Sequence, residues 1–169
     1  MEARQPVIVF SPLPAGLSVL SSLLFQESLP ASILLDLSQL DTVKEEMLHR
    51  WLHQKEEEQL ARYRFPKRHR EYLGGRLCAK EGLSLFLQGL KTSPLPPPPS
   101  RCRVAAEESG RPYFHLQEDD QCDFAIPNLS ISHSEDYGAA LISNTPCGID
   151  IQYHDPGLER VKERFCTET

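Results

Sequence analysis

Residues 128–152, NLSISHSEDYGAALISNTPCGIDIQ, decide the fold that we expect for this chain. The segment contains three stretches with apolar residues at strand-like spacing, and polar turns separate them. The stretches are residues 129–133, 137–143 and 148–152, and the turns are residues 134–136 and 144–146. This pattern predicts three strands that follow one another as a meander.

Polar residues fall at two edges of the predicted meander. Ser132 and His133 close the first strand, and Asp150 and Gln152 lie two positions apart on the third strand. Side chains two apart on a strand share one face of the sheet, so Asp150 and Gln152 are expected side by side. Taken alone, His133 is most simply a hydrogen-bonded structural histidine, and Asp150 a turn or capping residue. A functional role for them therefore depends on the motifs that accompany them.

Length and composition indicate a globular protein of 169 residues that forms one domain or two small halves. The formal net charge of −6 argues against general attraction to nucleic acid or to anionic membranes. The five cysteines are an odd number without a CxxC pair, which is typical of reduced thiols in the cytoplasm. The N-terminus lacks the features of a signal peptide, and no apolar run reaches the ~18 residues that cross a membrane. We therefore expect a cytoplasmic protein.

Residues 62–90 form the second informative segment. Seven Lys and Arg residues but one acid, Glu71, fall between Arg62 and Lys80, which is unexpected in an acidic protein. Pro66 suits the first turn of a helix, and apolar residues at helical spacing follow it. Five basic residues crowd the beginning of this predicted helix: Arg62, Arg64, Lys67, Arg68 and Arg70. They indicate either a solvated face or, because a helix N-terminus also attracts anions, a phosphate-binding site.

Three glycines, Gly74, Gly75 and Gly82, lie within the same predicted helix, although each costs ~1 kcal/mol relative to alanine. They are explained either by close packing of the helix against a sheet or by a ligand that approaches its backbone.

Trp51 is expected in the core. Elsewhere we predict strands at 6–10, 33–37 and 103–106. We predict helices at 16–26 and 155–165, and a helix that begins at Ser38 or Asp41 and runs to residue 52. Residues 55–58 are expected to form a solvated helix face, and residues 92–100 a stiff proline-rich connector.

Three motifs occur in a fixed order downstream of the basic helix. They are Gly110-Arg111-Pro112, then LSISHS at residues 129–134, then GIDIQ at residues 148–152. This arrangement resembles the 4′-phosphopantetheinyl transferase superfamily, of the larger pseudo-dimeric type, from about residue 33 to the end of the chain. The resemblance implies an α+β fold with a small antiparallel sheet and a long packed helix. The implied domains are an N-terminal extension (1–30), a first half (31–146) and the opening strand and helix of an incomplete second half (147–169).

Enzymes of this family use Mg²⁺ to transfer the phosphopantetheine arm of coenzyme A to a serine of an acyl or peptidyl carrier protein, as in fatty acid, polyketide or nonribosomal peptide biosynthesis. The resemblance implies that Asp150 and Gln152 hold the metal and that His133 and Asp150 are catalytic. Arg111 and His133 would bind phosphate oxygens, and Ser132 would help to hold the nucleotide. The implied ligands of the 3′-phosphate are Arg62, Arg64, Lys67 and Arg70.

Two departures from the family pattern leave alternatives open. Gln152 stands where many members carry glutamate, so this position contributes no charge to the metal. The third family motif, a W-x-x-K-E helix, does not follow, because the one tryptophan is Trp51 and the sequence stops at Thr169. We therefore expect the N-terminal portion of such an enzyme, with possible self-association through the unfinished half. The alternatives are a non-catalytic fragment that binds coenzyme A or a partner and, less well supported, a basic helix that binds nucleic acid.

Overall fold

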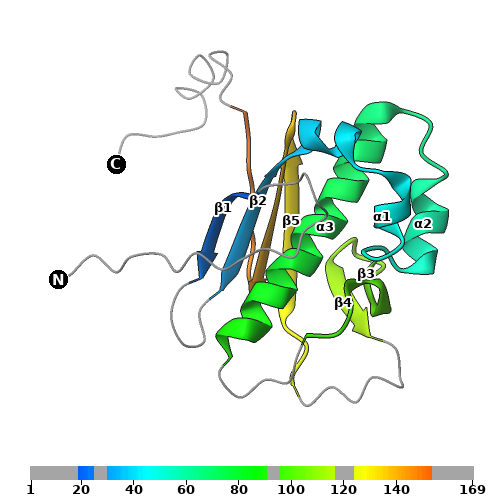
Figure 1. Ribbon diagram of the computed structural model, residues 1–169. Coiled ribbons are helices and arrows are strands. Elements are labelled where there is room, and N and C mark those ends of the chain that lie inside the picture. Colours follow the sequence, from blue (N-terminus) through cyan, green and yellow to red (C-terminus); the bar gives the residue numbers. More distant parts are fainter. Residues whose placement is uncertain (1–18, 25–29, 91–95, 117–123, 154–169) are drawn as a thin grey trace, which may run out of the picture.

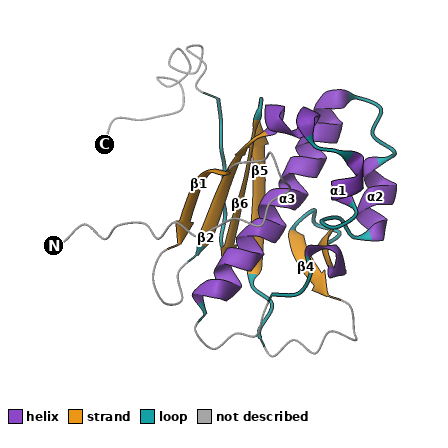
Figure 2. Cartoon of the chain, viewed as in Figure 1, coloured by secondary structure: helices purple, strands orange, loops and turns teal. Residues whose placement is uncertain are grey.

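A four-stranded antiparallel sheet, with a long helix across one face, forms the body of the protein (Figures 1 and 2). The computed structural model describes residues 19–24, 30–90, 96–116 and 124–153. The strands are β1 (Val19–Leu24), β2 (Ala31–Asp36), β3 (Cys102–Ala106), β4 (Pro112–Leu116), β5 (Asn128–Ser134) and β6 (Tyr137–Ser143). The helices are α1 (Glu45–Leu48), α2 (Gln54–Leu60) and α3 (Pro66–Gly89), with short 3-10 helices η1 (Leu37–Thr42) and η2 (Pro99–Arg101). The predicted α+β fold is confirmed.

The strand order in the main sheet is β1-β2-β6-β5, and all neighbours are antiparallel. The β5–β6 hairpin is the first turn of the predicted meander, with Ser134 paired to Tyr137. Strand β5 is therefore at an edge of this sheet. Strands β3 and β4 form a separate two-stranded sheet next to α3. No helix in the described part of the chain is long and apolar enough to cross a membrane.

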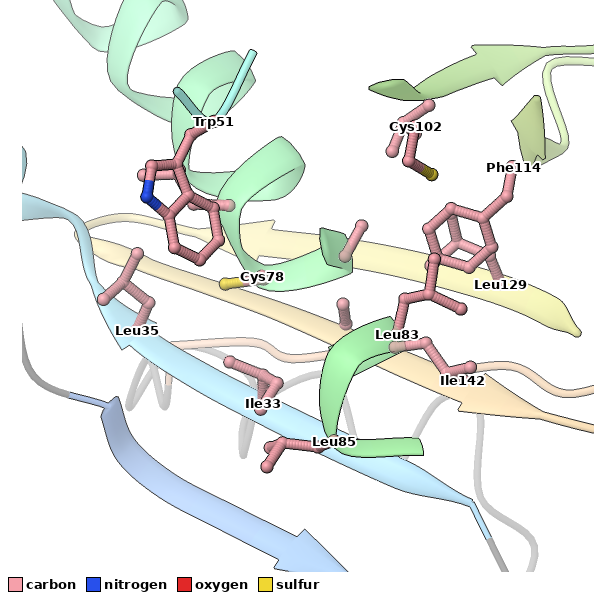
Figure 3. Packing of buried hydrophobic residues seen from close by; sticks show 14 of the residues in the cluster. Ile33, Leu35, Trp51, Cys78, Leu83, Leu85, Cys102, Phe114, Leu129 and Ile142 are labelled. Atoms are coloured by element: carbon pink, nitrogen blue, oxygen red, sulfur yellow. The ribbon is translucent and has the colours of Figure 1, made fainter. Parts of the chain in front are cut away.

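Helix α3 packs directly against the main sheet, and its glycines permit this close approach. A Cβ atom at Gly74 would overlap the Leu37 side chain, and one at Gly82 would overlap Ile142. Both neighbours are fully buried, so they have little room to move. Figure 3 shows how apolar side chains from α3 and the sheet meet in this core. Close packing against the sheet is confirmed for Gly82, whereas Gly74 packs against η1 and Gly75 also lines a cleft.

A buried ion pair, Glu56 with Lys80, joins the elements on the other side of α3. Lys80 Nζ donates to Glu56 Oε2, to the Trp51 carbonyl at 2.7 Å and to the Pro99 carbonyl at 3.0 Å. Glu56 Oε1 accepts the backbone N–H of Val104 at 2.8 Å. The predicted solvated face at residues 55–58 is therefore wrong at Glu56, which is 1% exposed because it has a charged partner inside. Burial lowers the pKa of Lys80, and the adjacent Glu56 opposes that shift. Trp51 is buried as predicted.

Three local predictions are corrected. Residues 19–24, within the predicted helix at 16–26, form strand β1, because they pair with β2; the sheet thus extends into the segment that we assigned to the N-terminal extension. The helix predicted from 38–41 to 52 is split into η1 and the four-residue α1. Asp36, rather than Ser38 or Asp41, is the N-cap of η1, since its carboxylate accepts the Ser38 N–H at 2.9 Å. The predictions at 6–10 and 155–165 lie outside the described residues.

The third predicted strand, residues 148–152, is also wrong. The structure assigns no strand there. The backbone N–H groups of Ile149, Ile151 and Tyr153 instead donate to serine hydroxyls of β5, at 2.9–3.1 Å. The segment is extended with alternating exposure, as predicted. Hydrogen bonds to serine side chains hold it in place, whereas a strand would be held by hydrogen bonds between backbones.

Candidate functional site

A cleft of about 380 Å³ lies where α3 meets β5 and the turn between β3 and β4. Gly110 and Pro112, from the G-R-P motif, form part of its wall. Gly110 has φ +87°, a left-handed conformation that favours glycine and lets the turn close tightly. The polar and aromatic side chains that line the cleft are Tyr63, Arg68, Glu71, Tyr72, Arg76 and His133. Two of the three family-like motifs therefore meet the basic helix at one place.

The acidic group in this cleft is Glu71, which lies between Arg68 and His133. Its Oε2 accepts from Arg68 Nη1 at 3.2 Å, and its Oε1 is 3.7 Å from His133 Nδ1. The Glu71 side chain is 8% exposed, whereas those of His133 and Arg68 are 41% and 66% exposed. The carboxylate thus holds the Arg68 guanidinium and lies next to the His133 imidazole, while both of these side chains are partly exposed to solvent. An anion at the cleft mouth would be attracted by both.

Aromatic side chains form one side of the cleft. The rings of Tyr63 and Tyr72 are 5.1 Å apart and tilted by 43°, and Arg76 Cζ lies 3.8 Å above the Tyr72 ring. Burial raises the pKa of the Tyr72 hydroxyl, and Arg76 partly opposes this shift, so the hydroxyl stays protonated at neutral pH. Flat rings and a guanidinium group are the surfaces on which a nucleobase stacks. The cleft therefore combines basic and hydrogen-bonding side chains with aromatic surface.

Of the basic residues that the sequence singled out, Arg68 lines this cleft and the others do not. Arg70 Nη1 is paired with Asp41 Oδ2 at 3.0 Å, beside a different cavity of about 440 Å³. Lys67 Nζ lies 3.7 Å from Glu135 Oε2 at the surface. Arg111 Nη2 donates to Asn128 Oδ1. Arg62 and Arg64 are exposed. Their assignment to a 3′-phosphate stays a prediction.

Asp150 and Gln152 are both exposed on the extended segment after β6, where they share one side. Ser132 Oγ donates to Asp150 Oδ1 at 3.0 Å. Ser132 and His133 are neighbours on β5, so their side chains point to opposite faces of the sheet. His133 faces α3, and Asp150 lies on the other face. Because β5 is an edge strand, a ligand that contacts both residues has to pass around that edge.

The donors present suit a weakly held hard cation. A carboxylate and an amide oxygen are ligands that Mg²⁺ accepts, and Mg²⁺ usually keeps several waters or substrate oxygens besides. Within the described residues there is no group of three or more His, Cys, Asp or Glu side chains arranged for a metal. Asp150 and Gln152 therefore fit Mg²⁺ as a partial set of ligands, with the remaining positions left to water and ligand phosphates.

Sequence reasoning named Arg68 among the basic residues but missed several other residues of the cleft. Arg68, Tyr72 and Arg76 repeat at a spacing of four, so helical periodicity places them on one face of α3. That periodicity was a usable signal, whereas the contact of Tyr63 with Tyr72 and of Glu71 with His133 depends on tertiary packing. The same helix carries Lys80 and Glu81, but both side chains are buried and neither lines the cleft.

The fold agrees with that of a known class of transferase. No family profile matches the sequence, and no curated protein matches it. Among solved structures, the chain is similar to the holo-(acyl-carrier-protein) synthases, which shows that it shares their fold. The identities are below 25%.

Three of these structures illustrate the likeness. The synthase from Bacillus anthracis str. Ames in complex with CoA (3′,5′-ADP) has a TM-score of 0.52 and 22% identity, over 67% of this chain and 91% of that one. The ACPS–CoA complex from Chronobacterium ammoniagenes has a TM-score of 0.54 and 20% identity, over 68% and 93%. The Helicobacter pylori synthase with coenzyme A has a TM-score of 0.54 and 17% identity, over 68% and 98%.

Proposed function

We propose that this chain binds coenzyme A as a phosphopantetheinyl transferase-like protein, and that the cleft between α3 and β5 receives the nucleotide end. The observation that carries the proposal is the meeting of His133, Arg68 and the Tyr72–Arg76 stack in one cleft. The shared fold with synthases solved in complex with coenzyme A supports it. The adenine ring would stack beside Tyr72 and Arg76, and the phosphates would bind His133 and Arg68.

The reaction would be transfer of phosphopantetheine to a serine of an acyl or peptidyl carrier protein in the cytoplasm. The serine oxygen forms a bond to the β-phosphorus of coenzyme A. The bond between that phosphorus and the bridging oxygen of the pyrophosphate breaks, and 3′,5′-ADP leaves with that oxygen. The serine proton passes to a base. Mg²⁺, held through Asp150 and Gln152, would offset the charge on the pyrophosphate. His133 would bind a phosphate oxygen from the α3 side, so that the pyrophosphate passes around the edge strand β5.

A second candidate is a protein that binds coenzyme A without transferring it. One observation favours it: Gln152 adds no charge to Asp150. General acid–base assistance is worth about 10²–10⁴ in rate, so a chain without a positioned base would bind its ligand yet react slowly. Self-association or a partner would then be needed to complete the site.

The two candidates differ in one measurement. An apo acyl carrier protein is incubated with coenzyme A, Mg²⁺ and this chain, and its mass is followed by mass spectrometry. For the 169-residue chain alone we expect transfer that is very slow or undetectable at catalytic amounts of protein. Complete conversion at those amounts would establish the transferase and would mean that residues 1–169, alone or in a homodimer, form the whole site. The Asp150→Ala variant is the control, since it should abolish whatever transfer is seen.

A further inference from the structure

Three serines of β5 hold the segment that carries Asp150. The hydroxyls of Ser130, Ser132 and Ser134 accept the backbone N–H groups of Ile149, Ile151 and Tyr153, at 3.1, 3.1 and 2.9 Å. Each bond joins residues that are 19 positions apart, so the extended segment runs parallel to β5 in strict register. We call these three residues the serine ladder. The side chains lie on the sheet face opposite α3, because the intervening Ile131 contacts Gly75 of that helix.

The central member of the serine ladder has a second contact. A serine hydroxyl can donate one hydrogen bond and accept two. Ser132 Oγ accepts from the Ile151 N–H at 3.1 Å and donates to Asp150 Oδ1 at 3.0 Å. One hydroxyl thus fixes both the backbone that follows Asp150 and the carboxylate itself. Asp150 is exposed, so without this contact its carboxylate would be free to change rotamer.

We infer that Ser132 is a positioning residue for Asp150: it orients the carboxylate for a divalent cation and does not bind the nucleotide. The hydroxyl is already used by two partners on the face away from the cleft, whereas His133 points into the cleft. A nucleotide in the cleft is therefore on the other side of β5 from Ser132. The inference rests on the proposed function, because it gives Asp150 the role of a metal ligand, and it replaces the nucleotide contact that the sequence implied for Ser132.

The test compares two members of the serine ladder. The probe is Mn²⁺ alone, titrated into the whole chain and followed by electron paramagnetic resonance. Ser132→Ala should raise the Kd for Mn²⁺ about fivefold to tenfold, the effect expected of one lost hydrogen bond near a charge. Ser130→Ala removes only the contact to Ile149, so it should leave the Kd within about twofold. Ser132→Thr keeps a hydroxyl and should restore binding.

Amide hydrogen exchange supplies a readout that does not depend on the metal. Ser132→Ala should speed exchange at Ile151, and Ser130→Ala should speed it at Ile149. Equal Mn²⁺ affinity in the parent and Ser132→Ala, or equal weakening by Ser130→Ala and Ser132→Ala, would overturn the positioning role. So would a loss of coenzyme A affinity in Ser132→Ala with the metal chelated, because that would return Ser132 to the nucleotide. Failure of the proposed function is distinguishable, since the parent chain would then bind no coenzyme A at all.

Discussion

Replacing Lys80 with methionine should lower the free energy of unfolding by about 3–5 kcal/mol, the cost of leaving one partner of a buried ion pair uncompensated. Lys80 and Glu56 are 2% and 1% exposed, so water cannot replace the lost ammonium group. The substitution also leaves the carbonyls of Trp51 and Pro99 without their donor. Because these groups join α2, α3 and the connector before β3, the loss should affect the whole domain and not one helix.

Urea denaturation followed by circular dichroism measures this effect. Lys55→Met is the matched control, because Lys55 is an exposed lysine in the same helix as Glu56 and should change stability by less than about 0.5 kcal/mol. The double variant Lys80→Met with Glu56→Gln should recover part of the loss, since it removes the uncompensated charge. If Lys80→Met unfolded at the same urea concentration as Lys55→Met, the ion pair would not be a structural centre.

Arg68→Gln should raise the Kd for coenzyme A by about tenfold to a hundredfold, because hydrogen bonds to charged groups contribute about 1.5–3 kcal/mol. Arg68 lines the cleft and is paired with Glu71. Without the guanidinium, the Glu71 carboxylate would repel the ligand phosphates. His133→Gln should weaken binding in the same range, because it removes the imidazole from the same cleft wall.

Two neighbours serve as controls for these variants, with binding measured by calorimetry. Arg70→Gln changes an arginine on the same helix that is paired with Asp41 away from the cleft, so it should alter the Kd less than twofold. His115→Gln changes an exposed histidine of β4 that does not line the cleft. A larger effect of Arg70→Gln than of Arg68→Gln would favour the set of phosphate ligands predicted from the sequence over the cleft seen in the structure.

The sequence predicted the elements whose signals are local. Alternation and turn residues located β5 and β6, and Pro66 with helical periodicity located α3. What it missed depends on contacts between distant residues. The sequence near Glu56 does not indicate that this side chain is buried in an ion pair with Lys80. The alternation of apolar and polar residues at 148–152 is the same for a strand with backbone hydrogen bonds and for a segment bonded to serine side chains.

The candidate site was predictable in its motifs but not in its grouping. The order and spacing of the motifs identified His133 and Asp150 as candidate site residues. Their positions on opposite sides of β5 follow from the hydrogen bond between Ser132 and Asp150. The choice among the basic residues was also beyond the sequence. Charge alone treats Arg68 and Arg70 as equal, and only their partners, Glu71 and Asp41, distinguish them.

The central claim is that the cleft between α3 and β5 binds the nucleotide end of coenzyme A. Calorimetric titration of the parent chain with coenzyme A and with dephospho-coenzyme A, each with Mg²⁺, tests it most directly. We predict saturable binding of coenzyme A and a Kd for dephospho-coenzyme A that is about tenfold higher or more, since one charge-assisted phosphate contact is lost. Absence of binding for both ligands would contradict the coenzyme A site, and equal affinity for both would contradict a 3′-phosphate contact in the cleft.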